Sequence, residues 1–432
     1  MPGYIEDRWL SKKPDPKTGK RRRTAMYGKG KRYKVAGIPG VRDRSFPDGK
    51  LADAKRWLTE ASADTERGTF YDPRRGQMTL ETYIRQHWWP SLRHQPTTLE
   101  AMEYRVFGHI VPIIGKMPLA QIGHDEVKAW VRAAEQRIDV GTLRVTWRHL
   151  SLILQAAHKA KRIPENPMRD EDLRPPAKPK SKAIAWPQPT VLAVREELAE
   201  RYRVLVDLGV GAGLRQGEAL GISPDDVDGD ELQVVRQVVK VRSKLAFAPP
   251  KRGKERAAPC PPELAAAIKR HMDLYPPVEV TLPWVDPDRP GIAWDDLPKR
   301  TVRLLVTSPR TGGVSGGAIN RGTLDAKQWK PALAAAGVIP PPVEHVTKRP
   351  GARPVVRLEW APSRQHGFHV LRHTFASVVL EAGETIAQLA AWLGHTDPAF
   401  TLRTYIHFLP QSGARGMEAL GRYLTSPAAD SP

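Results

Sequence analysis

The most informative part of the sequence is a C-terminal segment that gathers two histidines, an arginine and a tyrosine within about forty residues. It reads FHVLRHTFAS and then LAAWLGHTDPAFTLRTYIHF, and the residues concerned are His369, Arg372, His395 and Tyr405. A phenol acts as a covalent nucleophile only when one neighbour removes its proton and another neutralises the charge of the group that it attacks. Histidine and arginine meet these two needs. Together with Arg215 in the upstream motif GAGLRQGEAL, the pattern predicts a phosphate-handling site.

In their order and spacing, these motifs resemble those of the tyrosine recombinases, the site-specific recombinases that include phage integrases. That family carries an arginine followed by an acidic residue, a hairpin lysine, His-x-x-Arg, Leu-Gly-His and a nucleophilic tyrosine. The matching residues here are Arg215 with Glu218, Lys251 in APPKRGKERAAP, His369 with Arg372, His395 in the Leu-Gly-His motif, and Tyr405. The sequence departs from the pattern at Gly217, where the family often has a small hydroxyl residue, and this concerns only a supporting position.

The resemblance implies DNA strand transfer without a metal or a nucleotide cofactor, because a tyrosine can store the broken phosphodiester as another ester. A phenol with an ordinary pKa is protonated at pH 7 and needs a base when it attacks. His369 is the first candidate for proton handling, and His395 is expected to hydrogen-bond the phosphate or the tyrosine. The planar guanidinium groups of Arg215 and Arg372 suit the charge that builds on the non-bridging oxygens.

The leaving 5′ oxygen needs a proton, which a lysine on a mobile hairpin could donate. Lys251 fits this role by resemblance, and Lys254 and Lys244 are close enough in the sequence to remain alternatives. We expect Glu218 to orient a cation, whether or not the site is catalytic.

Local signals place the motif residues on helices. His369 and Arg372 stand three apart within helical apolar spacing, so both project from one face. A helix over 385–393 is expected to begin at a Thr385 cap and to end at Gly394, which leaves His395 at a helix end. Asp397 and Pro398 then start another helix that carries Tyr405 about two turns on.

His369 and His373 are four residues apart, as in zinc-binding helices. The segment HVLRH lacks the glutamate of such helices, and no carboxylate-rich partner is evident, so we predict no metal site. His373 is expected to support the fold.

The overall composition points to a polyanionic partner. Lys and Arg number 68 against 47 Asp and Glu, a formal net charge of +21, which favours DNA. The first fifty residues alone hold 15 Lys or Arg and 5 Asp or Glu. Cys260 is the only cysteine, which excludes an intrachain disulfide and fits a reducing cytoplasm. No apolar stretch is long enough to span a membrane.

The predicted fold is multidomain and mainly α. Residues 1–72 form a small basic α+β module, 77–168 an all-α domain, 169–185 a polar Pro-rich linker, and 186–427 a mainly helical catalytic domain with a small antiparallel β-sheet. By resemblance, the first module binds arm-type DNA sites and the second clamps the core site. The candidate DNA contacts are Lys29, Lys31, Arg32 and Lys34 in the first module, and Arg144 and Arg148 in the second.

Several finer local predictions follow from the pattern. A capping box from Thr97 to Glu100 should open a helix, ELQVVRQVVKV should form one strand, and the following KLAFAPPKRGKERAAPCP should continue into a hairpin. The role of the Pro-rich stretch 276–362 is not readable from the sequence.

The expected function is that of an integrase that cuts and rejoins duplex DNA attachment sites as a homotetramer. It would integrate or excise a phage or mobile element through a 3′-phosphotyrosyl intermediate, with possible DNA-bending and directionality proteins as partners and a nucleoid-associated, cytoplasmic location. Two alternatives remain open: a DNA-binding regulator that has lost catalysis, and a type IB topoisomerase.

Overall fold

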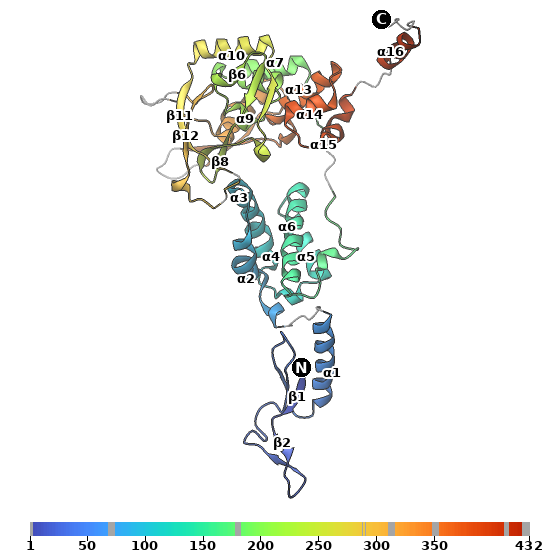
Figure 1. The fold of residues 1–432 in the computed structure, drawn as a ribbon. Helices are drawn as coiled ribbons and strands as arrows, with labels where there is room; N and C mark the ends of the chain where they lie inside the picture. The colour runs from blue at the N-terminus through green and yellow to red at the C-terminus, as the bar shows by residue number, and fades with distance from the viewer. Residues whose placement is uncertain are drawn as a thin grey trace. The chain divides into compact units, whose positions relative to one another are not determined.

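The structure is a computed structural model that describes residues 3–67, 74–177, 183–286, 288–289, 291–309, 316–347, 354–409 and 414–425. The chain divides into two compact units (Figure 1). The first comprises Met1–Leu92 and Leu99–Pro179, and the second comprises Arg93–Thr98 and Lys180–Pro432.

The N-terminal part of the first unit is a small sheet with one helix. Strands β1 (Tyr4–Asp7), β4 (Tyr33–Ala36) and β5 (Arg44–Phe46) pair antiparallel in the order β1-β4-β5, and β2 (Leu10–Pro14) pairs with β3 (Arg21–Arg23) in a separate ribbon. Helix α1 (Leu51–Glu66) buries Ala54 and Ala61 against Val35 and Phe46 of the three-stranded sheet. The predicted combination of short strands and one helix is therefore confirmed for this part of the chain.

The rest of the first unit is helical. Its helices are α2 (Leu80–Tyr83), α3 (Pro96–Arg105), α4 (Val111–Ile114), α5 (His124–Glu135) and α6 (Val140–Lys159), with π-helical turns at Ile84–Trp88 and Val106–Ile110. The predicted apolar stripes form its core, where Val127, Trp130, Leu150 and Leu154 are fully buried. The predicted capping box at Thr97 is wrong, because α3 begins at Pro96 and encloses that threonine.

Part of the predicted linker packs against this helical core. Leu173 is buried with the core residues of the helical part. Residues 178–182 of the linker lie outside the described residues.

The second unit starts with helices α7 (Gln188–Glu197), α8 (Glu200–Gly211) and α9 (Gln216–Ala219). Strands follow in two small antiparallel sheets, β6 (Val227–Asp228) with β7 (Glu231–Val234) and β10 (Arg256–Pro259), and β8 (Gln237–Val241) with β9 (Lys244–Ala248). The prediction of one strand over ELQVVRQVVKV is thus wrong, since β7 and β8 belong to different sheets. The predicted hairpin is confirmed only in part, because β9 pairs antiparallel with β8 across a short turn, whereas β10 pairs with β7.

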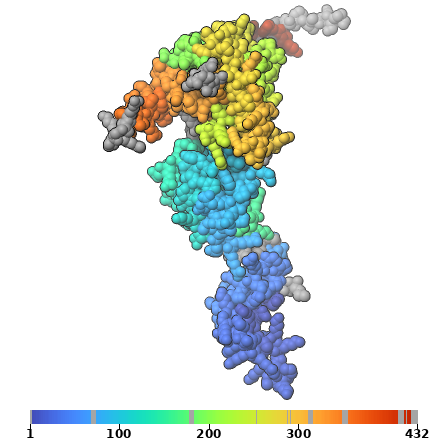
Figure 2. Space-filling view, turned by 90° about the vertical axis from the view of Figure 1, so that its left-hand side faces the viewer, coloured from blue at the N-terminus to red at the C-terminus, as the bar shows by residue number. Residues whose placement is uncertain are grey.

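The Pro-rich stretch contains regular structure. After α10 (Pro262–Leu274), strands β11 (Val278–Pro283) and β12 (Lys299–Leu304) form a ribbon, and α11 (Arg321–Leu324) and α12 (Lys330–Ala335) follow. Strands β13 (Val343–Thr347) and β14 (Val355–Glu359) form a second ribbon, with every strand residue exposed. In Figure 2 the orange atoms of this region project from the surface of the unit.

The C-terminal helices are α13 (His369–Glu381), α14 (Ile386–Leu393), α15 (Pro398–Tyr405) and α16 (Ala414–Thr425). Helix α13 packs closely on α8 at Gly209, where an added Cβ would lie 2.7 Å from Leu371 Cδ1. Each unit has its own buried core. The predicted fold class, mainly α with small antiparallel sheets, is confirmed. Among the described residues, we find no helix with the length and apolarity needed to cross a membrane.

Candidate active site

The predicted catalytic residues of the second unit come from four elements that pack together. Arg215 is the residue before α9, and His369 and Arg372 lie on the first turn of α13. His395 follows the end of α14, and Tyr405 is the last residue of α15. The structure therefore brings together residues that are separated by up to 190 positions in the sequence.

Predicted caps position two of these residues. Thr385 caps α14 through a bond from the Gln388 amide, and Gly394 ends the helix in the left-handed conformation with φ of 63°. Asp397 caps α15 by accepting from the Ala399 amide at 2.9 Å. Side-chain caps and a C-terminal glycine fix where a helix starts and stops, so His395 lies at a helix end and Tyr405 lies about two turns into α15, as predicted.

Glu218 orients Arg215. The carboxylate is fully buried, and Arg215 donates to it from Nη1 at 2.7 Å and from its backbone amide at 2.9 Å. A second guanidinium, that of Arg256, donates to both carboxylate oxygens. Burial alone would raise the pKa of Glu218, but the hydrogen bonds and charges of Arg256 and Arg215 lower it to about 2. Glu218 thus stays ionised and fixes two cations at the site.

Arg372 lies beneath the site with no exposed side-chain surface. Its Nη1 donates to the Gly213 carbonyl at 2.8 Å, and its Nη2 donates to the Leu393 carbonyl and lies 3.2 Å from His395 Nε2. Its Nε is buried and has no hydrogen-bond partner among the described residues. Burial and the charges of Arg215 and Arg256 lower the pKa of Arg372 to about 9, so it remains a cation at neutral pH.

The contacts of His395 define its tautomer. Nε2 faces the Arg372 guanidinium, which can only donate, so Nε2 must accept. Nδ1 then carries the proton and donates to Thr401 Oγ1 at 2.7 Å. Burial and the neighbouring arginines lower the pKa of His395 to about 3, which keeps the ring neutral. His395 contacts the cation and Thr401, and no hydrogen bond joins it to the tyrosine.

Tyr405 is almost fully buried, and its hydroxyl lies 3.0 Å from Nδ1 of His373. Burial raises the pKa of Tyr405, although the charges of Arg372 and Arg215 act in the opposite direction. Burial, Arg372 and His407 lower the pKa of His373 to about 4. A neutral imidazole therefore faces a protonated phenol.

The sequence predicts that His373 supports the fold, and the structure places its ring against the tyrosine hydroxyl, a contact that the sequence did not indicate. The available signal was its position one helical turn after His369 and directly after Arg372. Arg256 was also missed, although it lies in the same KRGKER segment as the predicted lysines. Neither residue type nor spacing indicated which of these cations would be buried.

His369 has an exposed face, and its ring stands edge-on to His373 at a centroid distance of 4.8 Å. Partial desolvation by the surrounding protein and the charges of His373 and Arg372 lower the pKa of His369 to about 4. Because the residue is exposed, a ligand can approach its side chain from solvent.

The candidate lysines lie near the start of β10. Lys251 is exposed in a 3-10 turn, Lys251–Gly253, that joins β9 to β10, and Lys254 is exposed directly after it. Arg256 anchors this connection to Glu218. Lys244 lies at the start of β9 with its ammonium group 5.3 Å from the Trp294 ring centroid. Lys251 and Lys254 thus remain candidates for the acid that protonates the leaving 5′ oxygen, and the segment that carries them is anchored by Arg256.

The predicted DNA contacts fall into two groups. Lys29, Lys31 and Arg148 are exposed. In contrast, Arg32 pairs with Asp7 and Asp48, Lys34 pairs with Asp43, and Arg144 donates to the Pro176 carbonyl. The second group is already engaged within the protein, so the exposed group is better placed to meet a phosphate.

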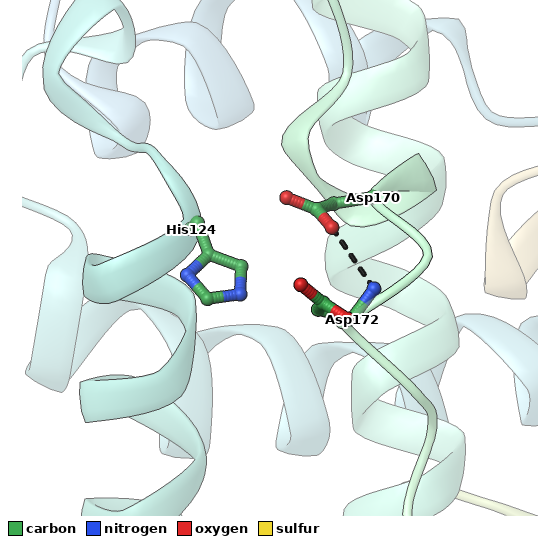
Figure 3. A group of neighbouring side chains, drawn as sticks. All are labelled: His124, Asp170 and Asp172. Carbon is green, nitrogen blue, oxygen red and sulfur yellow. Dashed lines mark hydrogen bonds between the residues drawn. The ribbon is translucent and has the colours of Figure 1, made fainter.

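One set of possible metal-binding side chains occurs among the described residues, outside the predicted catalytic set. His124 at the start of α5 and the exposed Asp170 and Asp172 have donor atoms within 4.8 Å of one another (Figure 3). Asp170 Oδ1 already accepts from the Asp172 amide at 2.9 Å. Exposed carboxylates of this kind are common without a cation, and the His124 side chain is itself 31% exposed.

Sequence comparison finds related integrases, although no family model matches the chain. The integrase of Mycobacterium phage D29 is 25% identical over 359 residues, covering 82% of this chain and 80% of the relative. A tyrosine recombinase XerC-like protein of Caldanaerobacter subterraneus subsp. tengcongensis is 25% identical over 248 residues, covering 52% of this chain and 51% of the relative.

Solved structures share the fold. The Tn1549 transposon integrase in complex with a circular intermediate DNA superimposes with a TM-score of 0.58 at 15% identity, covering 80% of this chain and 99% of the other. A lambda integrase tetramer bound to a Holliday junction gives a TM-score of 0.54 at 14% identity, covering 90% of this chain and 97% of the other.

Proposed function

We propose that the chain acts as a tyrosine recombinase in which Tyr405 cuts duplex DNA at specific sites and rejoins it through a 3′-phosphotyrosyl intermediate. The observation that carries this proposal is the position of the Tyr405 phenol within a cluster of Arg215, Arg372 and Arg256. A single buried carboxylate, that of Glu218, opposes these three guanidinium groups among the described residues of the cluster. The surplus positive charge suits one phosphodiester.

In this mechanism, the arginines neutralise the charge that builds on phosphorus. Glu218 accepts a hydrogen bond from Nη1 of Arg215, and the rest of this guanidinium is proposed to bind the phosphate. Charge-assisted donors fixed before the reaction stabilise a transition state without reorganisation. Removal of one such donor typically slows the chemical step by about 10²–10³-fold.

The histidines and a lysine complete the assignment. We assign phosphate binding to the exposed His369, and the orientation of Arg372 to Nε2 of His395. Lys251 is proposed as the donor that protonates the leaving 5′ oxygen. No step in this scheme needs a metal or a nucleotide, since the tyrosine ester conserves the energy of the broken bond.

The proposed division of labour follows the three domains that the sequence predicts. Residues 1–72 would bind arm-type sites, 77–168 would clamp the core site, and 186–427 would cut and rejoin the strands. We propose a homotetramer that pairs two duplex sites, by analogy with the lambda integrase tetramer on a Holliday junction. Integration or excision of a mobile element in the cytoplasm, with DNA-bending and directionality proteins as possible partners, is the proposed purpose.

The test is covalent trapping in EDTA with nicked duplexes tiled across the ends of the element. Wild type should form a protein–DNA adduct that survives a denaturing gel, and Tyr405→Phe should form none. Tyr423→Phe is the matched control, because Tyr423 is 83% exposed and should leave the adduct unchanged.

Two outcomes would overturn the proposal. Tight site-specific binding by wild type without any adduct would favour the catalytically silent regulator. Relaxation of plasmids that lack an attachment site would favour the topoisomerase.

A further inference from the structure

We propose that His373 is the group that takes the phenolic proton from Tyr405 when the tyrosine attacks the phosphate. This inference rests on the proposed function and assigns its general base. It also changes the sequence-based expectation, which gave proton handling to His369. The hydroxyl of Tyr405 is the reacting atom, and it lies 3.0 Å from Nδ1 of His373.

Geometry separates His373 from the other two histidines of the site. Both ring nitrogens of His395 are engaged, one with Arg372 and the other with Thr401. The ring of His369 packs nearly perpendicular to that of His373 and has no hydrogen bond to the phenol. A general base must lie within hydrogen-bond reach of the proton that it removes. Among the histidines of the site, the structure gives this position to His373.

Packing holds the two rings in place. His373 lies on α13 directly after Arg372, whose side chain is fully buried. Tyr405 ends α15 and stacks on Phe408 with a ring-centroid distance of 6.1 Å. Since both helices are anchored in one apolar cluster with Phe375 and Leu393, the hydrogen bond joins two fixed groups.

The protonation states suit the transfer. Burial raises the pKa of Tyr405, so the phenol carries its proton at neutral pH and cannot attack without a base. The charged or titratable groups around His373 are Arg372 and His369 on its own helix, Tyr405 on α15, and His407 just after α15. Burial, Arg372 and His407 keep the pKa of His373 low, so its ring is neutral and able to accept.

A bound phosphodiester would make His373 a stronger base. Its negative charge would offset the charge of Arg372, which lowers the pKa of His373, and an added negative charge raises the pKa of a nearby imidazole. The proton acceptor thereby becomes effective only when the substrate is in place.

The proposed step balances. A bond forms between the Tyr405 oxygen and phosphorus, the bond from phosphorus to the 5′ oxygen breaks, and the phenolic proton moves to Nδ1 of His373. The 5′ oxygen takes its proton from a separate donor, for which Lys251 is proposed. On rejoining, the imidazolium returns the proton to the tyrosine oxygen as the phosphotyrosyl bond breaks.

The first experiment measures single-turnover adduct formation by His373→Gln from pH 5.5 to 8.5. Glutamine can keep a hydrogen bond to the phenol but cannot take its proton. We expect cleavage to slow by about 10²-fold or more, with unchanged site binding and, at neutral pH, unchanged thermal unfolding. His345→Gln is the control, because His345 is an exposed histidine of β13 that pairs with Glu359. Cleavage by His373→Gln within about threefold of wild type would overturn the proposal.

A second experiment separates proton removal from positioning. Tyr405 is replaced by a ring-fluorinated tyrosine, whose phenol is more acidic and needs less help from a base. If His373 removes the proton, the defect of His373→Gln should shrink markedly in the fluorinated protein. A defect of unchanged size would show that His373 only positions the ring, and would overturn the proposal. Adduct formation by wild type in the same assay tests the proposed function independently.

Discussion

Arg256 forms a bidentate ion pair with Glu218, donating from Nη1 to Oε1 at 3.1 Å and from Nη2 to Oε2 at 2.7 Å. The side chains are 6% and 0% exposed. Nε of Arg256 also donates to the Trp392 carbonyl at 2.7 Å. This pair therefore ties β10 to α9 and to the last turn of α14, the helices that position Arg215 and His395.

Replacement of this carboxylate should destabilise the second unit. Glu218→Gln leaves Arg256 and Arg215 buried or half-buried without their counter-charge, and removal of one partner of a buried pair costs about 3–5 kcal/mol. Urea unfolding followed by tryptophan fluorescence measures the change. The control is Glu81→Gln, which removes the partially exposed pair with Arg85 and should cost no more than about 1 kcal/mol. Equal losses in the two variants would contradict the prediction.

Gly213→Ala should distort the support of Arg372. Gly213 has φ of +62°, and an added Cβ would lie 2.6 Å from Phe375 Cδ1. Its carbonyl accepts from Arg372 Nη1. Gly229→Ala is a matched control, because Gly229 has φ of +59° with open space around it. The control should lose about 1–2 kcal/mol from the backbone alone, and Gly213→Ala should lose more stability and also slow cleavage. The same loss in both would exclude the steric effect.

Thr401→Val should weaken the orientation of His395. The buried Thr401 hydroxyl is the acceptor that fixes the tautomer of this histidine, and its loss leaves Nδ1–H without that partner. We expect adduct formation to slow by about tenfold, the equivalent of about 1.4 kcal/mol. Thr404→Val on the same helix is the control, since its hydroxyl bonds only the Phe400 carbonyl. Adduct formation by Thr401→Val at the wild-type rate would contradict the proposed role of Thr401 in orienting His395.

A sulfur substrate should identify the leaving-group acid. When sulfur replaces the bridging 5′ oxygen, the leaving thiolate needs no proton. Lys251→Ala should then cleave the ordinary duplex about 10²-fold more slowly, yet cleave the sulfur duplex at nearly the wild-type rate. Lys254→Ala serves as the parallel variant. Rescue by sulfur in Lys254→Ala alone would assign the acid to Lys254.

Stability should fall as the pH is lowered through the range set by the half-buried His373 and His395. The folded-state pKa values of His373 and His395 are lowered to about 4 and about 3, whereas an unfolded histidine has a pKa of about 6.5. Below about 6.5 the unfolded chain binds more protons than the folded chain, so the stability present above that pH is lost as pH falls toward 4. Calorimetry should show a lower unfolding temperature at pH 5 than at pH 7. His373→Gln should reduce this drop, and an unchanged drop would contradict the assignment.

The local features of the site could be predicted from sequence because each depends on neighbouring residues. Thr385, Gly394 and Asp397 are caps whose effect reaches only a few positions. The spacing of three between His369 and Arg372 places both on the first turn of α13 for the same reason. The sequence alone therefore determined which residue types could handle a phosphate and which helices carry them.

The tertiary structure decided which of these groups meet. Tyr405 lies against His373 and not against His369, one turn earlier on α13, or His395, after α14, because the packing of the C-terminal helices decides which ring meets the phenol. Packing also decides the contact of Arg256. This residue begins β10, and it reaches Glu218 because β10 pairs with β7, whereas β9 pairs with β8. Contacts between elements far apart in the chain depend on how whole faces pack. Sequence spacing thus determined the candidate groups, and packing determined which imidazole faces the phenol.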